Sequence, residues 1–311
     1  MLQLYFDVQL YLRIAELYDE HYVTAIYSEK NEVTIRQCCL DPSFLLHEAM
    51  ESGKAAILFS ATLTPLGYFR DVLGGEEDAK CLALPSPFPR ENFALLINGG
   101  ISTRYQHREE SIVPIARRIA CTVGAKKGNY LVYFPSYQYM QSVYEEFVSL
   151  CPETETLLQQ PGMEEGEREA FLERFSVDNP DSLVGFCVLG GIYSEGIDLK
   201  GERLIGVIVV GVGLPQIGPE PDRIRNYYNR LGLEGFAYAY QYPGMNKVLQ
   251  AAGRVIRSEK DKGVVVLIDD RFRTLSYQRL FPAHWSHKKY VVSESSLQNE
   301  LESFWNRQDE G

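Results

Sequence analysis

The sequence predicts an α/β fold built on a doubly wound parallel sheet, and two observations support this prediction. Several runs rich in β-branched residues are almost continuously apolar, which is typical of parallel strands covered on both faces. Segments with helical periodicity separate these runs along the chain, as right-handed βαβ units require. The predicted strands are residues 55–59, 130–134, 183–189, 204–210 and 263–268.

Helical patterns fill most of the remaining chain. We expect helices at residues 109–123, 137–150, 165–175 and 221–253, the last one broken at Tyr242-Pro243-Gly244 because proline and glycine interrupt helices. Near the beginning, residues 4–18 form a helical pattern. Residues 22–38 predict a β-hairpin that turns near Lys30 and Asn31, and a short helix follows it.

A proline-rich stretch divides the chain. Residues 84–89 read L-P-S-P-F-P, which no regular helix or strand accommodates, so we interpret them as a linker. Only one candidate parallel strand precedes the linker, whereas a typical sheet has about five or six. We therefore expect two parts, with residues 1–91 as the C-terminal remnant of an incomplete domain and residues 92–311 as a second, α/β domain.

Composition excludes several classes of protein. The chain has 31 Lys and Arg against 42 Asp and Glu, a net charge of −11, and 45% apolar residues, which argues against a disordered or low-complexity chain. No apolar run approaches the ~20 residues of a membrane helix, and the first residues do not form a signal peptide, so we expect a cytoplasmic protein without a membrane partner. The acidic balance still allows a local basic groove for nucleic acid.

Cysteine and histidine spacing predicts neither a disulfide framework nor a metal site. The six cysteines include no C-x-x-C pair, so we expect free thiols. His284 and His287 are three residues apart, but no cysteine or acidic residue stands at ligand spacing beside them.

The most informative string is Q-A-A-G-R-V-I-R at residues 250–257. If the helix continues through it, Gln250, Arg254 and Arg257 project from one face, and Gly253 allows a neighbour to approach closely. Two guanidiniums beside a parallel sheet suit a polyanion whose charge grows in a transition state. The alternative is a pair of surface arginines bound to acidic neighbours.

Two further strings follow predicted strands. Residues 190–198 read G-G-I-Y-S-E-G-I-D, and a glycine-rich turn at a strand's carboxyl end can present N–H groups to a ligand, although paired glycines alone are weak evidence. Residues 60–63 read S-A-T-L and also follow a strand. In a purely structural interpretation of that region, Thr64 caps a helix whose first residue is Pro65.

In this order, the strings resemble the XPD/DinG family of superfamily 2 DNA helicases. Residues 60–63 resemble motif III, residues 133–137 (Y-F-P-S-Y) motif IV, residues 194–198 motif V and residues 250–257 motif VI. The resemblance covers nearly the whole chain. It implies a RecA-like second motor lobe at residues 92–311 and the last segment of the first motor lobe at residues 1–91.

The resemblance also implies roles for individual residues. Arg254 and Arg257 would be arginine fingers that stabilise γ-phosphate charge. The implied ATP-binding residues are Gln250, Gly253, Glu195, Gly196 and Asp198. The implied contacts to single-stranded DNA are Ser136, Tyr137, Arg104 and Ser194, where Arg104 belongs to a basic and aromatic cluster with Tyr105 and Arg108. Ser60 and Thr62 would couple the two sites.

The sequence departs from the family in one respect that limits its activity. It contains no G-x-x-x-x-G-K-[ST] string, the Walker A loop that cradles phosphates, and residues 52–55 (S-G-K-A) are only its nearest approach. ATP and Mg²⁺ would therefore bind through the missing first lobe, where any iron–sulfur cluster would also lie. We expect this chain alone not to hydrolyse ATP.

Two alternatives belong to other functional classes. One is an ATP-independent nucleic-acid-binding or protein-interaction module. The other is a dinucleotide-binding enzyme, suggested by Gly211-Val212-Gly213 after a strand, but Gln216 occupies the position of the third glycine in that fingerprint.

Overall fold

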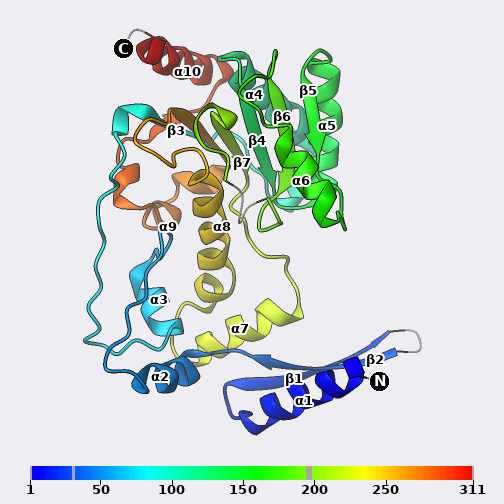
Figure 1. The fold of residues 1–311 in the computed structure, drawn as a ribbon, viewed down its shortest axis with the longest axis vertical. Helices are drawn as coiled ribbons and strands as arrows, with labels where there is room; N and C mark the ends of the chain where they lie inside the picture. Colours follow the sequence, from blue (N-terminus) through cyan, green and yellow to red (C-terminus); the bar gives the residue numbers. More distant parts are fainter. Residues whose placement is uncertain (1, 30–31, 194–197, 310–311) are drawn as a thin grey trace. The chain divides into compact units, whose positions relative to one another are not determined.

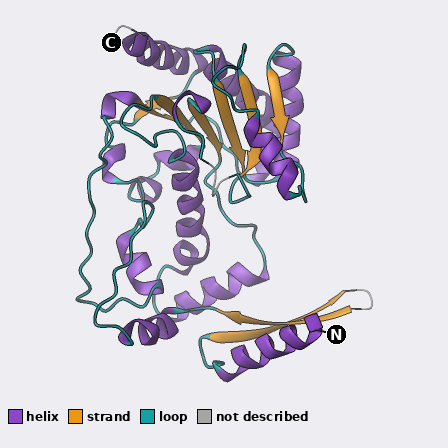
Figure 2. Cartoon of the chain, in the orientation of Figure 1, coloured by secondary structure: helices purple, strands orange, loops and turns teal. Residues whose placement is uncertain are grey.

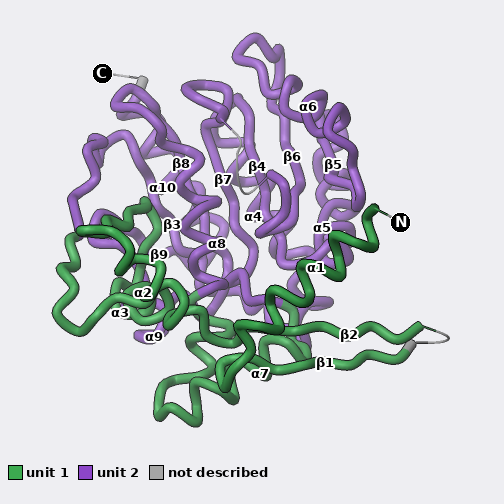
Figure 3. Tube along the Cα trace, turned by 60° about the horizontal axis from the view of Figure 1, so that its bottom comes forward, with its two compact units in different colours: residues 1–82, 216–242 green, residues 83–215, 243–311 purple. Residues whose placement is uncertain are grey.

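The computed structural model describes residues 2–29, 32–193 and 198–309, and it divides into two compact units (Figure 3). The first unit consists of Met1–Leu82 and Gln216–Tyr242, and the second of Ala83–Pro215 and Pro243–Gly311. The segment Gln216–Tyr242, which the sequence placed wholly with the C-terminal domain, thus packs with the N-terminal residues. In the described ranges, no helix combines the length and apolar character needed to cross a membrane.

The second unit contains the predicted parallel sheet (Figure 1). Its seven strands have the order β5-β6-β4-β7-β8-β3-β9, and each paired neighbour runs parallel. The strands are β3 (Phe93–Asn98), β4 (Asn129–Phe134), β5 (Glu155–Leu158), β6 (Leu183–Val188), β7 (Gly206–Val210), β8 (Gly263–Ile268) and β9 (Lys289–Val291). The α/β fold is therefore confirmed, as are the four strands predicted after the proline-rich stretch.

Helices cover both faces of this sheet. One face packs against α4 (Arg108–Gly124), α5 (Tyr137–Leu150) and α10 (Glu294–Asp309), and the shared core includes Val132, Phe186 and Val266. On the other face lies α6 (Glu165–Glu173), where the absence of a side chain at Gly185 in β6 leaves room for the rings of Phe171 and Phe175. The sheet is buried on both sides, which explains why its strands are continuously apolar.

The predicted long helix at residues 221–253 is interrupted elsewhere than expected. It consists of α7 (Pro219–Arg230) and α8 (Tyr242–Ala252), and the break falls near Gly232, whose φ of 77° a helix cannot contain. Pro243 does not interrupt a helix, because it lies in the first turn of α8. It follows the π-helical turn Ala237–Gln241, where the regular hydrogen-bond ladder is already interrupted.

The first unit has a small core of its own. It contains α1 (Leu2–Glu16), the antiparallel hairpin of β1 (Tyr22–Glu29) and β2 (Glu32–Cys39), α2 (Ser43–Glu51), α3 (Leu66–Val72) and α7. The hairpin is confirmed, while its turn residues Lys30 and Asn31 lie outside the described residues. Leu40 packs with Tyr227, Tyr228 and Tyr238, and the Tyr238 hydroxyl donates to the Asp71 carboxylate at 2.6 Å.

The predicted strand at residues 55–59 is wrong. These residues belong to none of the strands in the described ranges, and Figure 2 shows the stretch between α2 and α3 as loop. Ile57 and Phe59 are 84% and 89% exposed. Apolar side chains on both faces favour a strand only when neighbouring strands cover it, and the described residues supply no such neighbours.

Candidate functional site

Parallel pairing brings the segments that follow four strands of the second unit to one edge of the sheet. β4, β6, β7 and β8 all end there, because parallel strands point the same way. The segments that follow these strands begin with Pro135, Leu189, Gly211 and Asp269. In open α/β sheets this carboxyl edge is where ligands bind.

Ser136 and Tyr137 begin α5 directly after β4. The Ser136 Oγ accepts a hydrogen bond from the Tyr139 N–H at 3.4 Å, so Ser136 is the N-cap of α5. The Tyr137 ring is 37% exposed, and its hydroxyl accepts a hydrogen bond from the Gln159 amide at 3.0 Å. Both residues thus stand at the carboxyl edge, with the tyrosine held in a defined orientation.

Gln159, which the sequence did not single out, links three strand ends. It follows β5 and is only 2% exposed. Its Oε1 accepts from the Val188 N–H at 2.8 Å, while its Nε2 donates to Tyr137. A lone glutamine after a four-residue edge strand has no recognisable pattern, because its partners are 29 and 22 residues away in the chain.

The glycine-rich turn after β6 begins in a fixed geometry. Gly190 has a φ of 71°, and the Tyr193 carbonyl accepts a hydrogen bond from the buried Tyr133 hydroxyl at 2.7 Å. Ser194, Glu195 and Gly196 lie outside the described residues. The predictions for these three residues therefore stay predictions.

Asp198 lies beyond that gap and is exposed to solvent. Its carboxylate pairs with the Lys200 ammonium at 2.9 Å. This hydrogen bond lowers the pKa of Asp198 below its usual value, and the more distant charge of Arg257 acts in the same direction. Asp198 and Arg257 therefore lie within electrostatic reach of each other.

The predicted common helix face for Gln250, Arg254 and Arg257 is wrong. α8 ends at Ala252, so Gln250 is in the helix, whereas both arginines lie in the loop that joins α8 to β8. The helix stops at Gly253, a residue with poor helical propensity. Both arginines are half-buried.

The arginine loop is held in shape by Asp261. This carboxylate, in a residue only 5% exposed, accepts hydrogen bonds from the Arg257 N–H at 2.7 Å, the Ser258 N–H at 2.8 Å and the Ser258 hydroxyl at 2.6 Å. The sequence showed only a charged turn here. Asp261 thus fixes the backbone that carries Arg257.

The charge of Arg254 acts on a buried residue of the sheet, Tyr133. Burial raises the pKa of the Tyr133 hydroxyl well above its ordinary value, and the charge of Arg254 opposes that rise. Because Tyr133 also holds the turn after β6, Arg254 and that turn share a neighbour.

Arg104 and its basic and aromatic cluster follow β3. The Arg104 Nε lies 3.6 Å from the Asp270 carboxylate, and both side chains are partly exposed. The Arg108 guanidinium stands over the rings of Tyr105, at 5.5 Å, and Tyr139, at 4.9 Å. The exposed Tyr105 ring and the two arginines give this part of the edge a basic, aromatic surface.

A buried ion pair supports that surface. Asp269 is fully buried at the end of β8 and accepts hydrogen bonds from Thr103 and from the Arg271 guanidinium, at 2.7 and 2.9 Å. Burial alone would raise the pKa of Asp269, but the hydrogen bonds and charge of Arg271 hold it below its usual value. Asp269 thus ties β8 to the segment that precedes Arg104.

Ser60 and Thr62 belong to the first unit. The Thr62 N–H donates to the Ser60 Oγ at 3.2 Å, and Ser60 is exposed. The capping alternative for this region is wrong, because α3 begins at Leu66 with Pro65 at its N-cap position and without a capping side chain.

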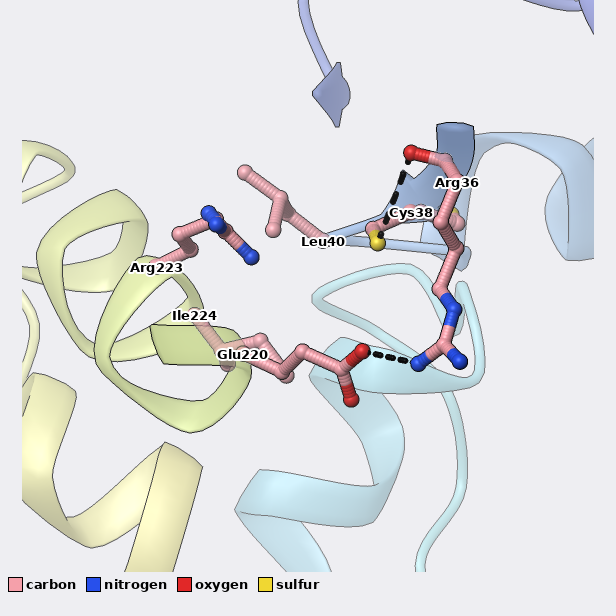
Figure 4. Close-up of a pocket in the computed structure, with 7 residues that line it drawn as sticks. Arg36, Cys38, Leu40, Glu220, Arg223 and Ile224 are labelled. Carbon is pink, nitrogen blue, oxygen red and sulfur yellow. Dashed lines mark hydrogen bonds and ion pairs between the residues drawn. The ribbon is translucent and has the colours of Figure 1, made fainter. Parts of the chain in front are cut away.

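The first unit also contains a shallow pocket of about 220 Å³ (Figure 4). It is lined by Arg36, Cys38, Cys39, Leu40, Glu220, Arg223 and Ile224, none of which is a predicted site residue. Arg36 pairs with Glu220, and Arg223 donates to the Tyr27 hydroxyl at 3.2 Å. In the described ranges, no three or more histidine, cysteine or acidic residues group together to hold a metal ion.

The glycines after β7 serve packing. Gly213 has a φ of 67°, and a Cβ on it would lie 2.4 Å from the Gly244 carbonyl oxygen. The backbone of α8 therefore approaches this turn closely, and the turn offers no room there for the pyrophosphate of a dinucleotide.

A seven-stranded parallel sheet, with candidate strings after β4 and β6 at its carboxyl edge and an arginine loop before β8, defines a RecA-like lobe of the helicase type. The family model described as the helicase C-terminal domain matches residues 119–288, more than half of the chain. The chain therefore belongs to this family, and it is a homologue of the XPD/DinG helicases.

Individual relatives agree with this assignment. The chain is 32% identical over 247 residues to the ATP-dependent DNA helicase DinG of Photobacterium profundum, a match that covers 76% of this chain and 35% of the relative. It is 26% identical to a probable ATP-dependent helicase of Methanocaldococcus jannaschii, covering 84% of this chain and 42% of the relative. The chain thus spans less than half the length of each of these relatives.

A solved structure has a similar fold. The solved structure named XPD_APO superposes with a TM-score of 0.64 at 20% identity, covering 91% of this chain and 57% of that one. At this identity the likeness shows the fold.

Proposed function

We propose that this chain is the second motor lobe, with the end of the first, of an ATP-dependent DNA helicase that moves along single-stranded DNA. The observation that carries the proposal is the loop after α8, where Asp261 accepts from the backbone N–H of Arg257, the last residue of the Q-x-x-G-R-x-x-R string. Arg254 and Arg257 act as arginine fingers on the γ-phosphate. Their charge counters the negative charge that spreads over the transferred phosphoryl group.

The nucleotide side of the lobe combines the strings after β6 and in α8. Gln250 is half-buried, and among the described residues no group hydrogen-bonds its amide, which fits a side chain that binds a ligand. In this proposal Gln250, Gly253, Glu195, Gly196 and Asp198 bind or orient ATP. In this proposal Mg²⁺ binds through the first motor lobe, where the Walker A loop of the family lies.

The DNA side uses the start of α5 and the cluster after β3. Ser136 and Tyr137 offer a helix N-terminus and an exposed ring, while Arg104 adds positive charge. Ser194 completes the set from the turn after β6. Ser60 and Thr62, at the end of the first-lobe segment, couple ATP hydrolysis to movement.

The domain boundary forms part of the proposal. Residues 1–91 are the last segment of the first motor lobe, and residues 92–311 form the second. Within this second part, Gln216–Tyr242 is an insertion that packs with first-lobe residues through Asp41 and Asp71, which accept from Tyr227 and Tyr238.

The test is ATP hydrolysis by the complete protein that combines residues 1–311 with a Walker A lobe. Replacing Arg254 or Arg257 by alanine should lower DNA-stimulated hydrolysis by about 10³-fold while leaving affinity for single-stranded DNA nearly unchanged. The matched control is Arg174→Ala. Arg174 forms an exposed ion pair with Glu155, the first residue of β5, and is not one of the proposed site residues. Normal hydrolysis by both alanine variants of the loop would contradict the proposal. DNA binding that never responds to nucleotide would favour the ATP-independent module.

A further inference from the structure

We propose that Lys247 binds a backbone phosphate of single-stranded DNA at the carboxyl end of β6, an inference that rests on the proposed function. Lys247 lies in the second turn of α8, three residues before Gln250, so both side chains occupy the same face of the helix. Both are half-buried. Among the described residues, neither forms a hydrogen bond or an ion pair.

The Lys247 side chain lies across the backbone of Gly190. A Cβ on Gly190 would stand 2.8 Å from Cε, 2.9 Å from Cδ and 3.0 Å from Nζ of the lysine. Gly190 also has a φ of 71°, which disfavours any other residue. The positive φ thus favours glycine here, and the lysine side chain passes through the space that a Cβ would fill.

The surroundings of the ammonium group suit an anion. The next residue, Gly191, packs against the Gln159 amide, whose nitrogen would lie 3.2 Å from a Cβ on that glycine. The same amide donates to the Tyr137 hydroxyl. Of these three polar side chains only Lys247 is charged, and no described carboxylate neutralises it.

The position favours DNA over nucleotide as the source of the phosphate. Lys247 reaches the turn after β6, beside Gln159 and Tyr137, which begins the proposed DNA-binding helix end. Arg254, proposed for ATP, lies beyond the C-terminal end of α8, about 10 Å along the helix axis at ~1.5 Å per residue. The middle of α8 would then contact a DNA phosphate and the loop after it the nucleotide, which makes α8 a direct mechanical link between the two sites.

The salt dependence of DNA binding tests this assignment. We would measure affinity of the complete protein for an oligo-dT single strand between about 50 and 200 mM salt, where each phosphate contact contributes about 0.7 to the slope of log K against log salt. Lys247→Gln should lower affinity several-fold and reduce the slope by about 0.7, while Lys247→Arg should retain both. Lys127→Gln is the matched control. It removes the same charge just before β4, at the opposite edge of the sheet, where Lys127 pairs with Asp181 at 3.4 Å.

Each outcome separates the inference from the proposed function. If the wild-type protein does not bind single-stranded DNA, the proposed function itself fails. If it binds and Lys247→Gln leaves the slope unchanged, the inference is overturned while the proposed function stands. A weaker affinity for an ATP analogue with an unchanged DNA slope also overturns it. Lys247→Met keeps the aliphatic stem, so it replaces Lys247→Gln if that variant melts at a lower temperature.

Discussion

Asp261→Ala should destabilise the second unit, because one buried carboxylate holds the arginine loop. The substitution removes three hydrogen bonds, two from the N–H groups of Arg257 and Ser258 and one from the Ser258 hydroxyl. Hydrogen bonds to charged groups contribute about 1.5–3 kcal/mol each. Arg257 and Ser258 are half-buried, so water can replace part of what is lost, and we expect a total loss of about 3 kcal/mol.

Urea unfolding, followed by tryptophan fluorescence, measures this loss of stability in the second unit. The chain has two tryptophans, Trp285 and Trp305, and both are buried in the second unit. With a slope of about 2–3 kcal/mol per molar urea, a loss of about 3 kcal/mol lowers the midpoint by about 1–1.5 M. Asp261→Asn keeps one acceptor oxygen in place, so its midpoint should fall by less than half as much as that of Asp261→Ala.

Asp181→Ala is the matched control for Asp261→Ala. Asp181 pairs with Lys127, but its side chain is 81% exposed, and exposed ion pairs contribute about 0–1 kcal/mol. A loss under 1 kcal/mol for Asp261→Ala, comparable with the control, would refute the reasoning. The loop would then hold its shape through other contacts.

Four further outcomes follow from the structure. Gly213→Ala should destabilise the second unit by more than about 2 kcal/mol, because the new Cβ would clash with the Gly244 carbonyl oxygen. Gly201 has a similar positive φ but open space around it, so Gly201→Ala should cost only the ~1–2 kcal/mol of backbone strain. The urea midpoint measures both. Because the pKa of Asp269 is lower in the folded state, its contribution to stability is present above the unfolded pKa of about 3.9 and is lost as pH falls through the folded value. Asp269→Asn should therefore flatten the acid limb of the stability curve. Residues 1–311 alone should release phosphate from ATP no faster than a protein-free control, and amides 55–59 should exchange faster than those of β6 and β7 by hydrogen-exchange mass spectrometry.

The centre of the sheet could be predicted from sequence, and its margins could not. β4, β6, β7 and β8 are long, continuously apolar strands with covered faces, so composition alone reveals them. The edge strands β5 and β9 have four and three residues, too few to show a period. β3, which pairs between β8 and β9, was not among the predicted strands, although it lies at the start of the predicted second domain.

In the candidate site, the sequence located the motif strings but missed single residues that act far from their place in the chain. The glycine and arginine strings are local patterns, so the sequence located the turn after β6 and the loop after α8. It could not foresee that α8 stops at Ala252, because helical spacing continues formally through Arg254 and Arg257. Gln159 and Lys247 were missed because each acts on a strand end far away in the chain.

The fast exchange expected for residues 55–59 tests how the chain is divided. Their N–H groups donate no backbone hydrogen bond in the described structure, and Leu58 is 53% exposed between the more exposed Ile57 and Phe59. Such an unpaired apolar run leaves its backbone groups open to other strands. In the residues 1–311 protein we expect exchange near the intrinsic rate, against protection set by global unfolding in β6 and β7. In the complete protein with a Walker A lobe, neighbouring strands should slow it to the level of those two strands. Strong protection of residues 55–59 in a verified monomer of residues 1–311 would show that the first part of the chain needs no other lobe to pair it.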